Sequence, residues 1–437
     1  MNRSHFLRCK FPRFTVLCGL LVTLLAVAHG QDTVSARDGF TQTPGGRGGR
    51  IVRVTTLEAK GPGSLAEAFT AQGPRIIVFE VGGVIDLAGQ SLRINEPFVT
   101  VAGQTAPAPG ITIIQGGIGI SAHDVIVQHL RVRPGEAGRA KHSGWEVDGI
   151  ATVGKAHDVI VDHCSCTWAT DENLSASGPR FEGDSADAWR DETSHKVTFS
   201  NCIIAEGLSQ STHTKGEHSK GSLIHDNATQ IAILGNLYAN NMERSPLFKG
   251  GTRGVVVNNL IVNPGRKAIH FALLPDEWTG HPWVTGQLAI VGNWLRAGAD
   301  SGRDLALMIH SRGPLELYLH DNRAVRRDGE PGPVFVSLSP TNGCEVVKSP
   351  PLWPERLKAL SVDQVREAVL AHAGARPWDR DAIDQRIIEQ ARNGTGRIIS
   401  SEQEVGGYPD LKATKAVFNP GEWNLDSMES RPASATK

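Results

Sequence analysis

The chain has 437 residues, of which 40% are hydrophobic and 6% aromatic, and its formal net charge is −1. This neutral balance argues against a nucleic-acid-binding protein, so any anionic ligand must be met by a local cluster of basic residues. The length would hold two or three ordinary domains, but a repeat that covers most of the chain indicates one elongated unit.

The N-terminal end has the three-part form of a secretory signal. Basic residues precede an apolar run from Val16 to Val27, and Ala28-His29-Gly30 supplies small residues at the cleavage spacing. The run is too short for a membrane span. Cys18 would suit a lipoprotein signal only if the run ended there, and it continues well past this position. We therefore predict that residues 1–30 are removed and that the protein is secreted, extracellular or periplasmic.

The next stretch is expected to close one end of the fold. Residues 31–44 are predicted to be a flexible lead. Ser64 follows Gly61-Pro62-Gly63 and is the expected N-cap of a short helix over Leu65–Phe69. A short amphipathic helix here would cover the open end of a stack of strands, as solenoids require.

A short pattern returns along the chain: apolar, any, apolar, polar, polar, then one small or apolar residue. The copies stand roughly 23 to 38 residues apart, a period typical of solenoids. Each copy is a strand too short to bury its own apolar face, and stacking on the next copy solves that problem. The final positions form one column: Leu130, Cys164, Cys202, Asn236, Asn259, Asn293 and Asn322. Stacked asparagines can hydrogen-bond from rung to rung, so we interpret them as structural.

The repeat therefore predicts an all-β fold, a right-handed parallel β-helix over residues 45–349. Cys164 and Cys202 fall on adjacent rungs of the column. They are close enough to form a disulfide in an oxidising compartment, and stacked buried thiols are equally consistent with the pattern. No pair of cysteines has the spacing of a zinc site.

The connections between rungs lengthen after Val125 and concentrate the charged residues, at 134–147, 170–196, 208–220 and 241–253. On a rigid scaffold, loops that project from one side usually build a binding cleft. After Ser349 the pattern changes to two helical segments, which begin after Ser361 and Asp381 and close with glycines. We predict that residues 350–437 are a helical extension without chemistry, which packs along the stack or caps its end.

Three separated motifs carry a resemblance to a known family: VIVDHCSCTWATDE at 159–172, KGEHSKGSLI at 215–224 and NMERSPLFKGG at 241–251. With turn phrases such as GPRIIVFEVGG, their order on a predicted β-helix resembles the pectate lyases of polysaccharide lyase family 1, from about Gly45 to Asn263. The resemblance implies a monomeric secreted enzyme that cleaves pectate by calcium-assisted β-elimination and leaves 4,5-unsaturated oligogalacturonides.

The resemblance also implies a calcium site. The reaction removes a weakly acidic proton beside a carboxylate, so catalysis must neutralise that carboxylate and hold a base near the proton. A hard cation such as Ca²⁺, held by carboxylates, would do the first job. The family pattern assigns the ligands to Asp148, Glu146, Asp171 and Glu172. The alternative is a solvated acidic loop.

Arg244 falls on the family's catalytic arginine, which acts as the base, and Lys220 on its active-site lysine. A free guanidinium is ordinarily protonated, so this role requires neighbouring cations that disfavour the charged form. The alternative for Arg244 is a salt bridge to Glu243 or a neighbouring loop. Lys249 matches a basic substrate-binding residue, and Lys215 is the substitute candidate for Lys220.

Other features refine or oppose this interpretation. Asp162-His163 is interpreted as a structural hydrogen-bonding pair. Trp278 and Trp283 could stack on sugar rings or pack within their loop. Leu234-Gly235-Asn236 stands where many family members carry His-His-Asn, and an insertion at 173–192 could reshape the calcium loop.

Competing functions on the same fold are a lyase of another polyuronate, a protein that binds polysaccharide without cleaving it, and a hydrolase. A hydrolase needs two carboxylates that flank the glycosidic bond. The Asn-Thr-Asp, Asp-Asp and Gly-His-Gly phrases expected of a polygalacturonase are absent from the middle rungs. Pectin esterases are disfavoured because the only Gln-Asp-Thr lies before the fold, at residues 31–33.

Overall fold

The computed structural model describes Met1, residues 33–339 and residues 343–431. The predicted secretory signal therefore lies outside the described residues, apart from Met1. In the described part of the chain, no helix combines the length and the apolarity that crossing a bilayer requires.

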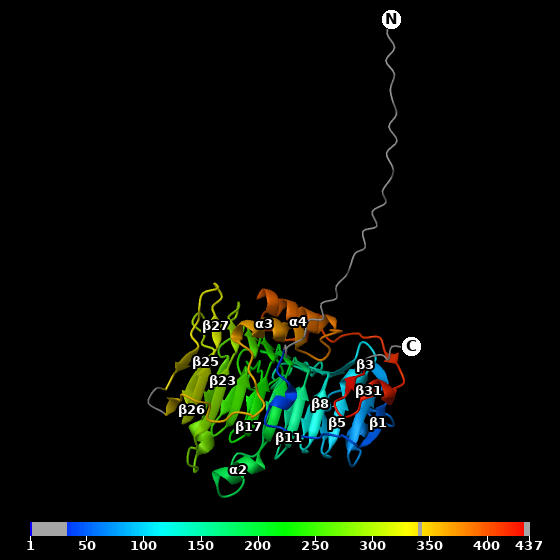
Figure 1. Ribbon diagram of the computed structural model, residues 1–437, viewed down its shortest axis with the longest axis horizontal. Coiled ribbons are helices and arrows are strands. Elements are labelled where there is room, and N and C mark those ends of the chain that lie inside the picture. The colour runs from blue at the N-terminus through cyan, green and yellow to red at the C-terminus, as the bar shows by residue number, and fades with distance from the viewer. Residues whose placement is uncertain (2–32, 340–342, 432–437) are drawn as a thin grey trace. The chain divides into compact units, whose positions relative to one another are not determined.

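Parallel strands wind around one apolar core, and each turn of the chain passes from a first sheet to a second and then to a third (Figure 1). The first sheet contains, in the described chain, β1 Arg50–Val54, β2 Arg75–Phe79, β5 Val99–Ala102, β8 Val125–Gln128, β11 His157–Asp162, β14 His195–Ser200, β17 Thr229–Leu234, β20 Arg253–Val257, β23 Gly286–Val291, β26 Leu315–His320 and β29 Cys344–Val346.

The second sheet contains β3 Val81–Asp86, β6 Ile111–Ile114, β9 Leu130–Arg133, β12 Ser165–Thr167, β15 Ile203–Ala205, β18 Leu237–Ala239, β21 Leu260–Val262, β24 Trp294–Arg296 and β27 Arg323–Val325, with β30 Thr414–Lys415 antiparallel on β3. The third contains β4 Leu92–Ile94, β7 Ile118–Ile120, β10 Ile150–Thr152, β13 Leu174–Ala176, β16 Leu223–Ile224, β19 Leu247–Lys249, β22 Ile269–Ala272, β25 Met308–Arg312 and β28 Phe335–Ser337. A separate hairpin pairs β31 Trp423–Asn424 with β32 Glu429–Ser430.

The helices are short and lie outside the stack. The α-helices of the described chain are α1 Leu65–Thr70, α2 Ala186–Glu192, α3 Val362–His372 and α4 Ala382–Asn393. The 3₁₀ helices are η1 Ala36–Asp38, η2 Gly103–Thr105, η3 Pro275–Trp278, η4 Glu402–Val405 and η5 Pro420–Glu422.

The repeated apolar positions fill one continuous core. Successive residues of a strand point to opposite faces, so every second side chain of each strand enters the interior. In β8, β11, β14 and β17 the paired residues Val125, Val159, Val197 and Ile231 lie in register, and all four are fully buried. The predicted parallel β-helix is confirmed.

The asparagines at the turn from the first sheet to the second form a hydrogen-bonded ladder. The side-chain amide of Asn236 donates to Asn259 at 3.0 Å, that of Asn259 to Asn293 at 2.9 Å, and that of Asn293 to Asn322 at 3.1 Å. Their predicted structural role is confirmed, because these side-chain amides donate hydrogen bonds to the asparagine of the next rung.

Cys164 and Cys202 continue this column as buried thiols. The backbone N–H of Cys164 lies 3.4 Å from Sγ of Cys202, and neither cysteine is in a disulfide. Of the two arrangements that the sequence left open, the structure contains the stacked thiols.

The predicted helix at the N-terminal end is present and one residue longer than expected. The hydroxyl of Ser64 accepts a hydrogen bond from the backbone N–H of Glu67 at 3.2 Å and so caps α1. Leu65 and Phe69 are buried in the core, so α1 covers apolar side chains of the first rungs.

Residues 33–43 differ from the flexible lead expected there. The side chain of Val34 is buried against Ala232 and Leu234, which point outward from β17. The hydroxyl of Thr41 donates to the carbonyl of Lys196 at 2.6 Å. The segment is ordered because the outer face of the first sheet offers it an apolar surface.

The C-terminal extension packs along the stack, where α3 and α4 lie side by side (Figure 1). Val365 of α3 and Ile387 of α4 are fully buried against the outer face of the second sheet, which contributes Ile203, Leu237 and Leu260. After α4 the extension is mostly irregular, in contrast to the helical extension expected over its whole length.

Buried ion pairs attach α4 to the second sheet. The guanidinium of Arg133 lies 2.6 Å from Asp381 and 2.7 Å from Asp384. The hydroxyl of Ser165 donates to Asp384 at 2.7 Å. These groups are all nearly or fully buried, so the start of α4 has one favourable position.

Residues 399–408, called the brace segment here, connect the extension to two loops that precede β10 and β16. The hydroxyl of Tyr408 donates to the carbonyl of Pro134 at 2.6 Å. The backbone N–H of Ser209 donates to the carbonyl of Ile399 at 2.8 Å. The extension therefore supports the long loops on the side of the stack where the charged residues gather.

Candidate active site

Three carboxylates gather where the chain passes from the second sheet to the third. Asp148 precedes β10, and Asp171 and Glu172 precede β13, so turns on adjacent rungs bring them together. One oxygen atom of each lies within 4.8 Å of the others. Asp148 accepts hydrogen bonds from the backbone N–H of Glu172 at 2.9 Å and from the hydroxyl of Ser175 at 2.6 Å, which fix its orientation.

Burial and repulsion between neighbouring carboxylates disfavour the charged forms of Asp148 and Glu172. Burial, and then the charge of Asp171, raise the pKa of Asp148 to about 6. Burial raises the pKa of Glu172 well above its ordinary value, although the charge of Arg244 opposes this. A divalent cation would relieve the repulsion, and carboxylate oxygens are the ligands that Ca²⁺ prefers. The residues present therefore fit a hard cation.

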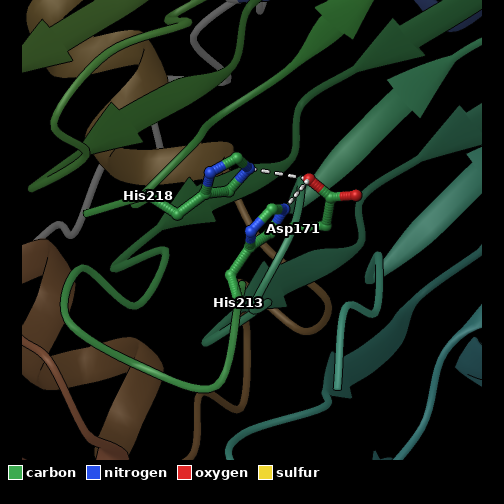
Figure 2. A group of neighbouring side chains, drawn as sticks. All are labelled: Asp171, His213 and His218. Carbon is green, nitrogen blue, oxygen red and sulfur yellow. Dashed lines mark hydrogen bonds and ion pairs between the residues drawn. The ribbon is translucent and has the colours of Figure 1, made fainter. Parts of the chain in front are cut away.

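Two histidines that the sequence analysis did not select hold Asp171 in place (Figure 2). Nε2 of His218 lies 2.7 Å from Oδ1 of Asp171, and Nε2 of His213 lies 3.6 Å from the same oxygen. The backbone N–H of Lys215 donates to Nδ1 of His213 at 3.0 Å, so Nε2 carries the hydrogen in the neutral ring. Both imidazoles therefore point hydrogen-bond donors at one carboxylate oxygen.

The two imidazole rings also stack, with their centroids 3.8 Å apart. Burial lowers the pKa of His218 to about 4, despite the hydrogen bond and the charge of Asp171, so the ring is neutral near pH 7. Burial would raise the pKa of Asp171, but the hydrogen bond and the charge of His218 outweigh it and lower the pKa to about 2. Asp171 is thus the carboxylate of the cluster that stays ionised. The position of His218 two residues before Lys220 was the only signal in the sequence.

Basic residues lie beside the acidic cluster on the next rungs. Glu172, Lys220 and Glu243 pair through parallel β-bridges, so their backbones stack in one column with alternating charge. The ammonium of Lys220 pairs with Glu243. Burial lowers the pKa of Lys220, although the charge of Glu243 opposes this. The guanidinium of Arg244 pairs with Glu172 and not with Glu243 among the described residues.

The backbone holds Arg244 in an unusual conformation. Its φ is 64°, in the left-handed region that residues with a Cβ rarely adopt. Its Nε is buried and has no hydrogen-bond partner among the described residues. Both features recur in the described chain, for example in the positive φ of Asn240 and the unpartnered Nε of Arg253, so they describe the turn at Arg244 without assigning it a role.

Glu146 and Lys215 occupy the outer edge of the site. The carboxylate of Glu146 accepts a hydrogen bond from the backbone N–H of Thr214 at 3.0 Å and another from its hydroxyl. Its Oε1 lies 3.4 Å from Nδ1 of His213. Glu146 therefore contacts the histidine loop and borders the same cavity as Asp148 and Asp171, although its carboxylate is not among the three described ones whose oxygen atoms lie within 4.8 Å of one another. The side chain of Lys215 is exposed.

Lys249 lies at the other end of the third-sheet strands. Its ammonium is 3.0 Å from Asp226 and also pairs with Glu277, which comes from the loop after β22. In that loop Trp278 is buried and its Nε1–H donates to Asp226 at 2.8 Å, so it packs within the protein. Trp283 is 44% exposed.

The insertion at 173–192 begins beside the acidic loops, where Ser175 holds Asp148, and leads away from them after β13. It includes β13 and α2, and its part after β13 leads from the third sheet back to the first. Its Trp189 and Phe181 pack against Trp278. The insertion thus forms a wall at the carboxyl ends of the third-sheet strands, opposite the carboxylate cluster.

Asp162 and His163 form the structural pair that the sequence predicted. Nδ1 of His163 lies 2.9 Å from Oδ2 of Asp162, and the hydroxyl of Ser200 donates to the other oxygen at 2.7 Å. The pair connects neighbouring rungs of the first sheet, away from the carboxylate cluster.

Comparison with known sequences finds fungal proteins that are similar to this chain. No family model matches the chain. A protein of Aspergillus flavus named probable pectate lyase C is 31% identical over 421 residues, which cover 94% of this chain and 90% of that protein. The protein of the same name from Emericella nidulans is 31% identical over 416 residues, which cover 94% and 86% of the two chains.

Solved structures share the fold at low sequence identity. The major allergen of cedar pollen is 15% identical and aligns with 77% of this chain and 92% of its own, with a TM-score of 0.53. A pectate lyase bound to a hexasaccharide is 13% identical and aligns with 80% and 99% of the two chains, with a TM-score of 0.51.

Proposed function

The chain belongs to the pectate lyase family, and from this we propose that it is a secreted enzyme that cleaves pectate, an α-1,4-linked polygalacturonate, by calcium-dependent β-elimination. The observation that carries the proposal is the juxtaposition of three carboxylates with Arg244 and Lys220 on adjacent rungs. A cation site next to basic residues suits a substrate whose every unit carries a carboxylate.

We assign the calcium ligands to Asp148, Asp171 and Glu172. When bound there, Ca²⁺ supplies positive charge that neutralises the uronate carboxylate and so makes the neighbouring proton more acidic. His213 and His218 orient Asp171 for this role, because both direct their Nε2 at its Oδ1. Glu146, the fourth ligand expected from the sequence, supports the histidine loop through Thr214 instead.

Arg244 is the proposed base, and its place supports the role. It lies beside the cluster that would hold the carboxylate, and its Nε has no partner among the described residues. Arg244 takes the proton from C5, and the electron pair of the broken C5–H bond forms the C4–C5 double bond. The bond from C4 to the glycosidic oxygen breaks. The oxygen takes up a proton and leaves as a hydroxyl, and the new end is 4,5-unsaturated.

Lys220 and Lys249 complete the proposal. Lys220 is buried beside Arg244, where its positive charge would stabilise negative charge on the substrate. Lys249 lies on β19, five residues after Arg244, and would bind a substrate carboxylate in exchange for its contacts with Glu277 and Asp226. Lys215 is exposed and free to reach the polyanion from the loop edge.

The test is ultraviolet absorbance during incubation with polygalacturonate at mildly alkaline pH, with Ca²⁺ and then with a chelator. The elimination product absorbs because its double bond is conjugated with the carboxylate, so we expect a rise that the chelator stops. Arg244→Ala should lower the rate at least about 100-fold, the contribution of a general base, with little change in melting temperature. Arg303→Ala, an exposed arginine, is the matched control.

Other outcomes would point elsewhere. Full activity of Arg244→Ala would remove Arg244 from the role of base. Reducing ends without absorbance would indicate a hydrolase. Binding without either signal would lead first to other polyuronates and then to a protein that binds polysaccharide without cleaving it.

A further inference from the structure

A groove leads away from the carboxylate cluster along the outer face of the third sheet. At one end its lining includes Asp148 and Asp171, and at the other it includes Ser91 and Arg93, with a volume of about 260 Å³. A second cavity of about 300 Å³ shares Ser91 and Arg93 and continues to Lys60. Arg93 therefore borders both cavities.

The floor of the groove is set by strand register. Arg93 of β4 pairs with Gly119 of β7, which pairs with Ala151 of β10, and this residue pairs with Ser175 of β13. Three strand spacings separate Arg93 from Ser175, roughly 14 Å at the usual separation of neighbouring strands. Between these two residues only small side chains point outward, so the groove stays open over this length.

The side chain of Arg93 leans along the groove toward the carboxylate cluster. A Cβ at position 119 would collide with its guanidinium, which shows that the guanidinium lies over the glycine of the next rung. Gly119 therefore provides the space in which Arg93 lies flat on the floor.

Arg93, like the exposed Lys215, has no acidic partner among the described residues. Lys220, Lys249 and Arg244 each pair with a carboxylate. Arg93 is exposed, and no ion pair or hydrogen bond of its guanidinium occurs in the described part of the chain. Its charge is therefore available to an anion in the groove.

We propose that Arg93 is a distal subsite that binds a carboxylate of the polyuronate beyond the unit held at the carboxylate cluster, with Lys60 in the adjoining cavity as a further basic residue. This inference rests on the proposed function for the identity of the ligand. A guanidinium binds a carboxylate in a forked geometry, which favours uronate units over neutral sugars. A polymer held at the carboxylate cluster would reach Arg93 along the open floor, whereas a single galacturonate unit would not.

The experiment compares Arg93→Ala with the control Arg303→Ala and measures kcat and KM for polygalacturonate, and the Kd of monomeric galacturonate in the presence of Ca²⁺. We expect Arg93→Ala to raise KM for the polymer about fivefold, the scale of one exposed ion pair, with kcat unchanged. The Kd of the monomer should stay the same. Calorimetry with Ca²⁺ and oligogalacturonides of increasing length, in the Arg244→Ala background, should show the loss of affinity only above a threshold length.

A second pair of measurements tests the chemistry of the subsite. Gly119→Leu should reproduce the Arg93→Ala effect, because a side chain at this position displaces the guanidinium. Methyl-esterified oligomers of the same length should bind Arg93→Ala and the parent equally, since esterification removes the charge that Arg93 recognises.

The outcomes separate this proposal from the proposed function. If the parent cleaves pectate but Arg93→Ala behaves like Arg303→Ala, or weakens monomer and polymer alike, the distal subsite is wrong. If the parent cleaves nothing but the length-dependent loss of binding remains, the lyase reaction is wrong and the subsite holds.

Discussion

Asp148 and Glu146 are two residues apart in the chain, but their carboxylates have different hydrogen-bond partners. Asp148 is held by Ser175 and by the backbone of Glu172 on the next rung. Glu146 is exposed and held by Thr214 of the histidine loop. The motif alone could not separate them, because both positions carry the same kind of ligand oxygen.

This difference can be tested through the calcium requirement. Asp148→Asn should raise the half-saturating Ca²⁺ concentration of the lyase assay at least about tenfold, because it removes a charged ligand from the cluster. Glu146→Gln, the matched control, should change it by about twofold or less, because its exposed hydrogen bonds to Thr214 survive in part. Equal effects of the two substitutions would show that Glu146 is a ligand.

At the scale of elements, α4 is attached to the second sheet at its first turn. Asp381 caps the helix by accepting the backbone N–H of Asp384 at 2.9 Å and also pairs with Arg133. Asp381→Asn keeps a good cap but removes the charge opposite a buried guanidinium. We expect a loss on the order of 3 kcal/mol of unfolding free energy at pH 7, measured by urea denaturation. Asp363→Asn on α3, whose carboxylate is 75% exposed, should cost less than about 1 kcal/mol.

The same pair predicts a pH dependence. Burial would raise the pKa of Asp381, but the charge of Arg133 outweighs it and holds the pKa well below the ordinary value. The unfolded chain therefore takes up this proton first as pH falls. The stabilisation is complete above the ordinary carboxyl pKa of about 4 and is lost at lower pH. Between about pH 5 and pH 3 the parent should lose more stability than Asp381→Asn, and parallel curves would contradict this account.

At the scale of the whole molecule, the C-terminal extension and the active-site loops are one structure. The brace segment holds the loop that carries Asp148 through Tyr408, and the loop that carries His213 and Lys220 through Ile399. An enzyme that lacks this segment would keep its stack of strands but lose the support of both loops.

Two truncations test this coupling. A chain that ends at Gly394 keeps α3 and α4 but lacks the brace segment, and it should lose at least about tenfold in kcat/KM, because loosely held catalytic groups rarely reach their reactive geometry. A chain that ends at Asp410 keeps the brace segment and should stay within about twofold of the parent. Circular dichroism and melting temperature establish that both chains fold. Equal activity of the two would show that the brace segment does not position the loops.

The amino-acid sequence alone determined the architecture of this protein. The repeat of apolar positions and the asparagine column are local patterns, and both impose the same backbone geometry on successive rungs. The caps of α1, α3 and α4 are local patterns as well. The motif residues Arg244, Lys220, Asp148 and Asp171 could be named for the same reason, since each stands at a constant offset from a recognisable strand.

Only the tertiary structure decided which side chains meet. His213 and His218 reach Asp171 from a different loop, and Arg93 joins the groove from a rung far along the chain. The lead segment packs on the first sheet and the extension on the second, because the outer faces of these sheets are apolar there. No local pattern encodes these contacts, because loop lengths between rungs vary and strand register sets which residues become neighbours.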